Sequence, residues 1–169
     1  MPTATFRVLF VFVVLSHARR RILHVNVTEH PTAAWTAQQL REAFPWDSAP
    51  SFLLRDRDSI YGSAVGRTVQ GLGVEEVLTA PHAPWQNPFV ERLIGSLRRE
   101  CLDNVIVWNE RSLRRHLSLY LTYYHAFRTH LGLAKNAPIS RPVPPPSTGA
   151  IVEVAHVGGL HHHYERRAA

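Results

Sequence analysis

PWQNPFVERLIGSLRREC, residues 84–101, carries the start signals of a helix and places one carboxylate on an otherwise basic helix face. Asn87 suits the N-cap, and Pro88 suits the first helical position because the N–H that it lacks would have no partner there. From Phe89 to Cys101 apolar residues recur at three- and four-residue steps, which predicts an amphipathic helix. At about 100° per residue, Glu91 points away from the centre of the apolar stripe.

A second segment, LLRDRDSIYG at residues 53–62, ends an apolar run with Asp56. Residues 51–55 are typical of a short strand, and residues 56–59 of a turn. A carboxylate at the end of a buried strand and another, Glu91, one turn into a later helix can share a divalent metal. That combination suggests phosphoryl-transfer chemistry on nucleic acid.

Both acids also have structural interpretations. Aspartates are common in turns because their side chains bond nearby backbone N–H groups, which accounts for Asp56 and, still better, for Asp58. Glu91 can be a solvated acid that the helix dipole favours. Gly95 costs about 1 kcal/mol relative to Ala inside a helix, and we interpret it as leaving room for a ligand or a DNA backbone.

Three motifs together resemble a known family. DRDSIY, then PHAPWQNPFVERLIGSLRRE, then YYHAFRTHLGL at 123–133 follow in order and spacing the integrase-like catalytic core of bacterial insertion-sequence transposases, within the DDE recombinase superfamily. The resemblance covers roughly residues 5–140. It implies an α/β, ribonuclease H-like fold in which helices flank a mixed sheet. It also maps the second catalytic Asp onto Asp56 and the catalytic Glu onto Glu91, both as metal ligands.

The chain departs from that family at its start. The resemblance implies three carboxylates, the first of them on the opening strand, yet no acidic residue precedes Glu29. Residues 6–15 and 22–27 look like the second and third strands. We therefore expect the first strand and its Asp to be missing, through a misassigned start or a decayed gene, and the chain to lack a complete active site.

The resemblance further implies two Mg²⁺ (or Mn²⁺) ions that promote DNA strand cleavage and transfer. The implied partners are transposon ends and target DNA, with homo-oligomers for the full-length protein and no small-molecule substrate. A non-catalytic remnant that binds DNA or another subunit is the alternative. The residues assigned to nucleic-acid contact are Trp85, Gln86, Asn87, Arg92, Arg98, Arg99 and Arg128.

Composition agrees with these interpretations. The 169 residues are 45% hydrophobic, enough for one moderate core, and the net charge of +6 favours a polyanionic partner. The single cysteine, Cys101, lies on the apolar stripe, excludes an internal disulfide and fits a reducing cytoplasm. The apolar run at residues 8–15 is too short to span a bilayer as a helix, so we expect a buried hairpin and no membrane association.

The domain boundaries and the remaining helices and strands are predicted from the spacing of apolar residues and from the positions of Pro and Gly. We expect an incomplete catalytic core over residues 1–136 and, over 137–169, a Pro-rich linker followed by a poorly ordered basic tail with one strand at 151–154. His161, His162 and His163 belong to that tail and are interpreted as surface residues. The other predicted elements are helices at 32–44, 64–70 and 110–127 and a strand at 74–79.

Overall fold

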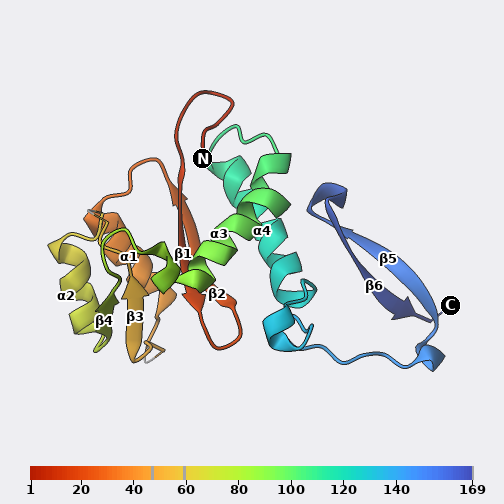
Figure 1. Ribbon diagram of the computed structural model, residues 1–169. Helices are drawn as coiled ribbons and strands as arrows, with labels where there is room; N and C mark the ends of the chain where they lie inside the picture. The colour runs from red at the N-terminus through yellow and green to blue at the C-terminus, as the bar shows by residue number, and fades with distance from the viewer. Residues whose placement is uncertain (47, 59, 169) are drawn as a thin grey trace.

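The computed structural model describes residues 1–46, 48–58 and 60–168 (Figure 1). Ser59, in the predicted turn, lies outside the described residues. The strands are β1 (Phe10–Ser16), β2 (Arg21–Thr28), β3 (Phe52–Arg55), β4 (Glu75–Leu78), β5 (Ala150–His156) and β6 (His161–Arg167). The α-helices are α1 (Ala33–Ala43), α2 (Ser63–Gly71), α3 (Pro88–Glu100) and α4 (Glu110–Ala126).

Strands β1 and β2 form an antiparallel hairpin whose register runs from Phe10 opposite Thr28 to Ser16 opposite Arg21. Their β-branched and aromatic residues fit a pleated, half-buried surface, which explains why this apolar run forms a strand. Arg20, with φ of 58°, lies in the left-handed region at the connecting turn. The predicted hairpin is confirmed, with Val14, Ile22 and Val27 as its buried residues and most of its other side chains half-buried.

Strands β3 and β4 run parallel, with Phe52 opposite Glu75 and Arg55 opposite Leu78. Parallel neighbours need a crossover connection, and α2 provides it. The described strands form three separate two-stranded sheets, so β3 pairs with β4 but not with β1. The predicted α/β class with antiparallel and parallel pairing is therefore present, whereas one continuous mixed sheet is not formed by the described strands.

The helix boundaries follow from their caps. Thr32 accepts a hydrogen bond from the Trp35 N–H at 3.2 Å and starts α1. Asn109 starts α4 through a capping box with Ser112, whose hydroxyl accepts from the Asn109 N–H. Both caps satisfy N–H groups that would otherwise lack a partner in the first helical turn.

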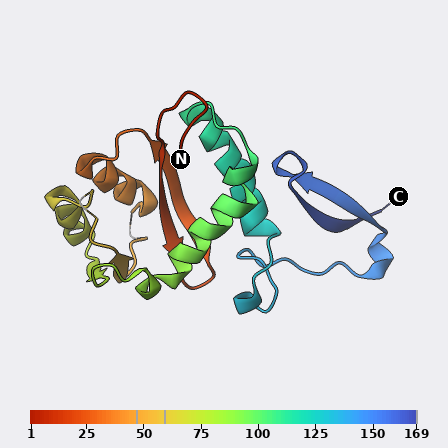
Figure 2. The ribbon, with the colours of Figure 1, turned by 45° about the horizontal axis from the view of Figure 1, so that its top comes forward.

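Two apolar clusters form the core. The larger one joins α3 and α4 to the β1–β2 hairpin, and the smaller one joins α1 and α2 to β1. Figures 1 and 2 show α3 lying across the hairpin, with α1 and α2 on the side of β3 and β4. Cys101 is fully buried in the larger cluster, as its place on the apolar stripe predicts. That cluster includes Val27, Leu93, Leu97, Leu113, Leu117, Tyr120 and Tyr124.

The C-terminal segment is more ordered than predicted. Residues 150–167 form the antiparallel hairpin β5–β6 in place of a single strand and a loose tail. The hairpin forms because its strands alternate partly buried and exposed side chains, and two of its histidines stack on α4 and on its C-cap. His161 stacks on Tyr123 with ring centroids 4.5 Å apart, and His163 stacks on Phe127 at 3.6 Å. Figures 1 and 2 show this hairpin beyond α4 at the end of an extended linker.

None of the helices in the described part of the chain has both the length and the hydropathy that crossing a membrane requires.

The larger cluster predicts where the fold is most sensitive. Leu113 is fully buried, so Leu113→Ala is expected to lower the free energy of unfolding by about 2–5 kcal/mol in urea denaturation. Leu119→Ala, on the exposed face of the same helix, is the matched control and should change it by no more than about 0.5 kcal/mol. Equal losses from the two variants would contradict the assignment of this core.

Candidate functional site

Asp56 follows the last residue of β3 and is exposed. One of its carboxylate oxygens accepts from the Asp58 N–H at 3.3 Å, and the Asp58 carboxylate accepts from the Ile60 N–H at 3.0 Å. Arg57 donates to the carbonyl of Thr79 at 2.9 Å, which ties this turn to the end of β4. Both aspartates therefore stabilise the turn through hydrogen bonds to its backbone. The second carboxylate oxygen of Asp56 has no protein partner among the described residues.

The position of Asp56 is supported by its neighbour Arg55. The Arg55 guanidinium donates two hydrogen bonds to Glu76, at 3.0 and 3.2 Å, and lies 4.8 Å from the ring centroid of Tyr61. Burial, together with the nearby carboxylates of Asp56 and Asp58, raises the pKa of Tyr61 to about 12. These contacts fix the direction in which the chain leaves β3.

Glu91 lies in the first turn of α3 and is exposed. No described residue bonds its carboxylate, whereas Glu29, Glu76, Glu100 and Glu110 each pair with an arginine. The helix starts at Asn87 and Pro88 as predicted, but the Asn87 side chain makes no capping bond, and its buried carbonyl oxygen has no partner in the structure. The start of α3 therefore presents two oxygen ligands, one exposed and one buried, that the described protein does not use.

A cavity of about 390 Å³ lies next to the segments that carry the two candidate acids, although neither acid lines it. Arg55 and Val90 both line it, and each is followed directly in the chain by one of the acids, Asp56 or Glu91. The end of β3 and the start of α3 therefore border the same hollow, and the joint role of Asp56 and Glu91 stays a prediction.

The donor set is suited to a hard divalent cation. Carboxylate and amide oxygens are the ligands that Mg²⁺ prefers, and the candidate ligands here are Asp56, Glu91 and the unsatisfied oxygen of Asn87. Within residues 1–46, 48–58 and 60–168, no group of three or more His, Cys, Asp or Glu residues is arranged to hold a metal. The oxygen atoms of these residues thus fit the ligand preference of Mg²⁺. Two of the three candidate ligands, Asp56 and Glu91, are carboxylates.

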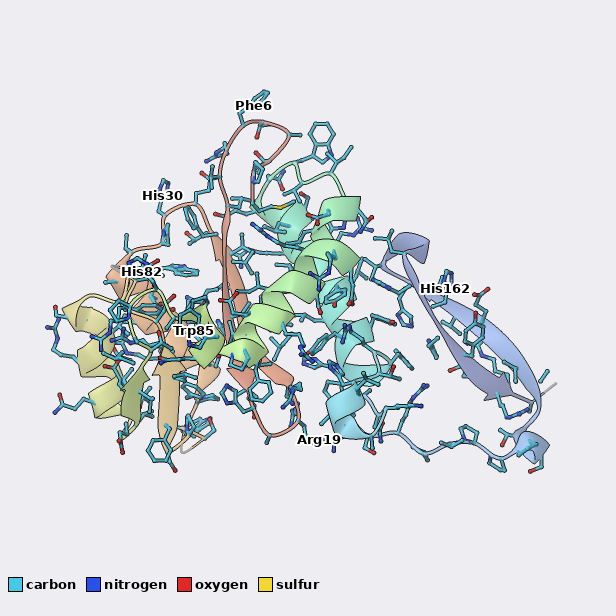
Figure 3. All side chains as sticks on the ribbon, viewed as in Figure 1. Phe6, Arg19, His30, His82, Trp85 and His162 are labelled. Atoms are coloured by element: carbon cyan, nitrogen blue, oxygen red, sulfur yellow. The ribbon has the colours of Figure 1, made fainter. Side chains whose placement is uncertain are left out.

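The loop before α3 holds two of the residues assigned to nucleic acid. Trp85, in the 3-10 turn η1 (Pro84–Gln86), is 73% exposed, and Figure 3 shows it over the region between β3 and α3. Gln86 accepts from the Ala80 N–H at 2.7 Å and thereby closes this loop. Trp85 is free to stack on a ligand, whereas the described contact of Gln86 is structural.

A second hollow lies on another side of α3 and contains three arginines. It measures about 230 Å³, and we call it the arginine hollow; its lining includes Arg20, Arg92, Ser96, Arg128 and His130. Burial, with the neighbouring Arg128 and Arg20 guanidiniums, lowers the pKa of His130 to about 4, so the imidazole is neutral at pH 7. Its buried Nε2 has no hydrogen-bond partner among the residues that the structure describes. The hollow is thus positively charged and contains an unsatisfied polar atom.

Two other arginines, Arg99 and Arg19, contact other parts of the same chain. Arg99 covers Gly95, where a Cβ would lie 3.0 Å from its guanidinium, so this side chain occupies the space interpreted as room for DNA. Arg19 donates to the carbonyls of Ala137 and Pro138 at 3.0 and 2.8 Å. Arg98 and Arg99 are exposed in the last turn of α3.

A polar network around Glu100 was not predicted from the sequence. Arg128 donates to both oxygens of Glu100, at 2.7 and 2.6 Å, and to the hydroxyl of Ser96 at 3.2 Å. The Tyr120 hydroxyl donates to the same carboxylate at 2.8 Å, and His161 lies 2.6 Å from the Glu100 carbonyl. Burial alone would raise the pKa of the Glu100 carboxyl, but the hydrogen bonds from Arg128 and Tyr120 outweigh it, and the pKa lies below its usual value. This network holds α3, α4 and the C-terminal hairpin together.

Comparison with known proteins finds similarity to integrase and insertion-element proteins. Residues 72–138, which contain Glu91 but not Asp56, match the family described as integrase core domain. The chain is 25% identical over 151 residues to an uncharacterized 39.2 kDa protein of the insertion element IS476 from Xanthomonas euvesicatoria. The match covers 82% of this chain and 44% of that relative, so the chain spans less than half of the relative's length.

Two solved structures share the fold. The catalytic core domain of BIV integrase superposes with a TM-score of 0.57 at 18% identity, over 82% of this chain and 86% of that one. The simian T-cell lymphotropic virus intasome, solved by cryo-electron microscopy with the PP2A regulatory subunit B56γ, gives a TM-score of 0.62 at 16% identity, over 80% of this chain and 50% of that chain. The arrangement of helices and strands is therefore that of an integrase catalytic core.

The Arg128–Glu100 pair supplies a stability test. Arg128→Met is expected to lower the free energy of unfolding at pH 7 by about 1–3 kcal/mol, between the values for exposed and buried pairs. Arg111→Met is the control, because Arg111 is an exposed arginine of α4. It should leave the free energy of unfolding nearly unchanged. Urea denaturation of both variants measures the difference, and equal stability of Arg128→Met and the parent protein would show that the pair is not stabilising.

The same pair predicts a pH dependence. Since the folded pKa of Glu100 lies below the value of about 4.3 for an unfolded chain, its ionised form adds stability above that pH, and this contribution is lost as the pH falls through the folded pKa. The parent protein should therefore be more stable than Glu100→Gln at pH 7, and the difference should shrink below about pH 4. A difference that is constant between pH 7 and pH 3 would contradict the role of the ionised carboxylate.

Proposed function

We propose that this chain, which carries an integrase core of the kind found in insertion-sequence transposases, belongs to a recombinase that cleaves DNA strands and transfers them with divalent metal ions. The observation that carries the proposal is the integrase-core match over residues 72–138, which contain Glu91. It is supported by the cavity that Arg55 and Val90 line, because Asp56 and Glu91 directly follow these residues in the chain, although neither acid lines the cavity. The oxygen-rich donor set supports the same conclusion.

The proposed roles of the two acids follow from their environment. Asp56 and Glu91 would hold Mg²⁺ or Mn²⁺, with Asn87 as a neutral oxygen nearby. When bound, such ions activate the attacking oxygen and stabilise the leaving oxygen in phosphoryl transfer. The Arg55–Glu76 pair would keep Asp56 at the end of β3, and the buried Leu93 and Leu97 would keep Glu91 at the start of α3.

The proposed DNA contacts are basic and aromatic. The arginine hollow offers Arg20 and Arg92 to a phosphate, since the guanidinium fork suits phosphate oxygens. Trp85 is exposed and can stack on an unpaired base. We assign Arg128 mainly to Glu100, which already binds two of its nitrogens.

The chain by itself is proposed to be inactive. A site of this kind needs three carboxylates, and in this chain only Asp56 and Glu91 match the pattern. DNA binding and subunit contacts do not need the third acid. We therefore expect salt-dependent DNA binding by this chain, while strand transfer belongs to a longer protein that supplies the missing carboxylate.

Metal binding tests the site assignment. Asp56→Asn and Glu91→Gln are each expected to weaken Mn²⁺ binding by about tenfold or more, because each removes a charged ligand. Glu75→Gln, an exposed acid with no partner among the described residues, is the matched control and should bind as the parent does. Calorimetric titration gives the affinities, and equal Mn²⁺ affinity in all four proteins would remove the assignment.

DNA binding tests the arginine hollow. Arg92→Gln should weaken binding to duplexes of unrelated sequence about equally and should reduce the slope of log K against log salt by about 0.7–0.9, the value of one phosphate contact. Arg111→Gln removes the same charge from α4, outside the hollow, and is the control. If both variants change the slope alike, only net charge matters and the hollow has no special role.

A further inference from the structure

The arginine hollow carries more positive charge than the described protein neutralises. Its lining includes Arg20, Arg92 and Arg128, and no acidic residue of the described chain lines it. Arg128 is paired with both oxygens of Glu100. Arg20 donates to the carbonyl of His17 at 2.9 Å, and no described carboxylate pairs with Arg20 or Arg92. Two guanidinium charges of this hollow are therefore left for a ligand to neutralise.

The Arg20 guanidinium is held in place by its neighbours. Its central carbon lies 3.8 Å from the ring centroid of Phe89, and a Cβ on Gly132 would lie 3.3 Å from its Nη2. Its main chain is fixed as well, since the Tyr124 hydroxyl donates to the Arg20 carbonyl at 3.0 Å. A side chain that is already ordered loses less conformational entropy when it binds an anion. Arg20 is therefore preorganised for a ligand in the hollow.

His130 adds a hydrogen-bond donor whose tautomer is defined. Nη1 of Arg128 lies 3.4 Å from His130 Nδ1, and because a guanidinium can only donate, Nδ1 is the acceptor of this pair. The ring is neutral at pH 7, since burial and the guanidiniums of Arg128 and Arg20 lower its pKa to about 4. Its one ring N–H is therefore at Nε2, which is buried and has no hydrogen-bond partner among the described residues. A buried N–H without an acceptor is destabilising, so this ring needs an acceptor that the described chain does not supply.

The hollow is small, and much of its wall is apolar. Its other lining residues are two with hydroxyl groups, Ser96 and Thr129, and the apolar or aromatic Phe89, Leu93, Tyr124 and Leu131. Its volume of about 230 Å³ is below the roughly 300–1,000 Å³ of pockets that enclose drug-sized ligands. Apolar walls lower the local dielectric and so strengthen the attraction between a guanidinium and an anion. The hollow therefore suits a small group of high negative charge.

We propose that the arginine hollow binds the terminal phosphate group of a cleaved DNA strand, held by Arg20, Arg92 and the Nε2–H of His130. A terminal phosphate carries a charge of about −1.5 to −2 at pH 7, which matches the two unpaired guanidiniums, whereas a phosphate within a strand carries a single negative charge. It also offers three strong acceptor oxygens. The three donors come from three segments, namely the β1–β2 turn, α3 and the loop after α4, so a tetrahedral group meets them better than a planar carboxylate.

The identity of this ligand rests on the proposed function. When water cleaves a DNA strand, its oxygen bonds to phosphorus, one P–O ester bond breaks, and the released sugar oxygen takes up a proton. A phosphomonoester is thereby left on one of the two new ends. Arg92 directly follows the candidate metal ligand Glu91 on α3, so the hollow lies beside the proposed site of cleavage. Binding there would retain the phosphorylated end after the strand is cut.

Calorimetric titration of the whole chain with thymidine tetranucleotides tests the hollow. One tetranucleotide carries a phosphate at its 5′ end, one at its 3′ end, and one at neither end. At least one phosphorylated form is expected to bind about tenfold more tightly than the unphosphorylated form, because charge-assisted hydrogen bonds to the terminal group are added. Inorganic phosphate should compete for the hollow but bind more weakly than that tetranucleotide.

Two pairs of variants locate the terminal phosphate. His130→Phe keeps a ring against Tyr124, whose centroid lies 5.0 Å away, but removes the Nε2–H, and it should remove most of the tenfold gain. His30→Phe is its control, because His30 is exposed and lies at the opposite end of the β1–β2 hairpin from Arg19 (Figure 3). Arg20→Gln should also remove the gain, whereas Arg111→Gln, which loses the same charge outside the hollow, should keep it.

The imidazole of His130 gives a readout that does not depend on affinity. In ¹H–¹⁵N spectra of the histidine rings, inorganic phosphate should shift the Nε2–H resonance of His130 in the parent protein and leave the ring of His30 unchanged. This measurement needs no variant of the hollow.

Three outcomes would overturn the proposal. The first is equal affinity for the three tetranucleotides, and the second is a gain that persists in His130→Phe and Arg20→Gln. The third is inorganic phosphate binding as tightly as the phosphorylated tetranucleotides, which would identify free phosphate as the ligand in place of a DNA end. None of these outcomes depends on Mn²⁺ binding at Asp56 and Glu91, so the metal site and the phosphate site can fail independently.

Discussion

The ion pair between Glu100 and Arg128 holds the last turn of α3 to the end of α4, and the placement of the candidate site depends on it. The same carboxylate also accepts from Tyr120, which is fully buried between the two helices. Because α3 is anchored at this end by the pair and along its length by Leu93 and Leu97, its first turn has a defined position over the cavity. Glu91 is thus presented by a rigid helix, which is the arrangement that a metal ligand needs.

Helix α3 also separates the two hollows of the structure. Val90 lines the cavity between β1 and β3, whereas Phe89 and Arg92 line the arginine hollow. Glu91 lies between these residues in the same turn. An acid that binds a metal and an arginine that binds a phosphate would therefore be neighbours on one helix, with Arg92 lining the arginine hollow and Glu91 exposed between the two hollows. That spacing suits a polyanionic strand that passes over the start of α3.

Local signals in the sequence were sufficient for much of this fold. Asn87 and Pro88 marked the start of α3 because a helix start depends on a few adjacent residues, although the Asn87 side chain makes no capping bond, and the apolar stripe of α3 identified Cys101 as core. The order of the hairpin, the short strands and the helices followed in the same way. The likeness to integrase catalytic cores agrees with that reading.

Contacts between distant segments were not accessible from the sequence. Nothing adjacent to Arg128 indicated that Glu100 would bind both of its nitrogens, or that Arg99 would cover Gly95. The C-terminal hairpin was missed for a related reason, since its histidines gain their stacking partners Tyr123 and Phe127 only after α4 is in place.

Glu91 differs in its electrostatic surroundings from the other glutamates of the core. In a chain with a net charge of +6, arginines pair with Glu29, Glu76, Glu100 and Glu110. Among the described residues, none bonds the Glu91 carboxylate. A divalent cation at the start of α3 would therefore meet no competing arginine partner on this carboxylate, which is the electrostatic reason for assigning Glu91, and not one of the paired glutamates, to metal binding.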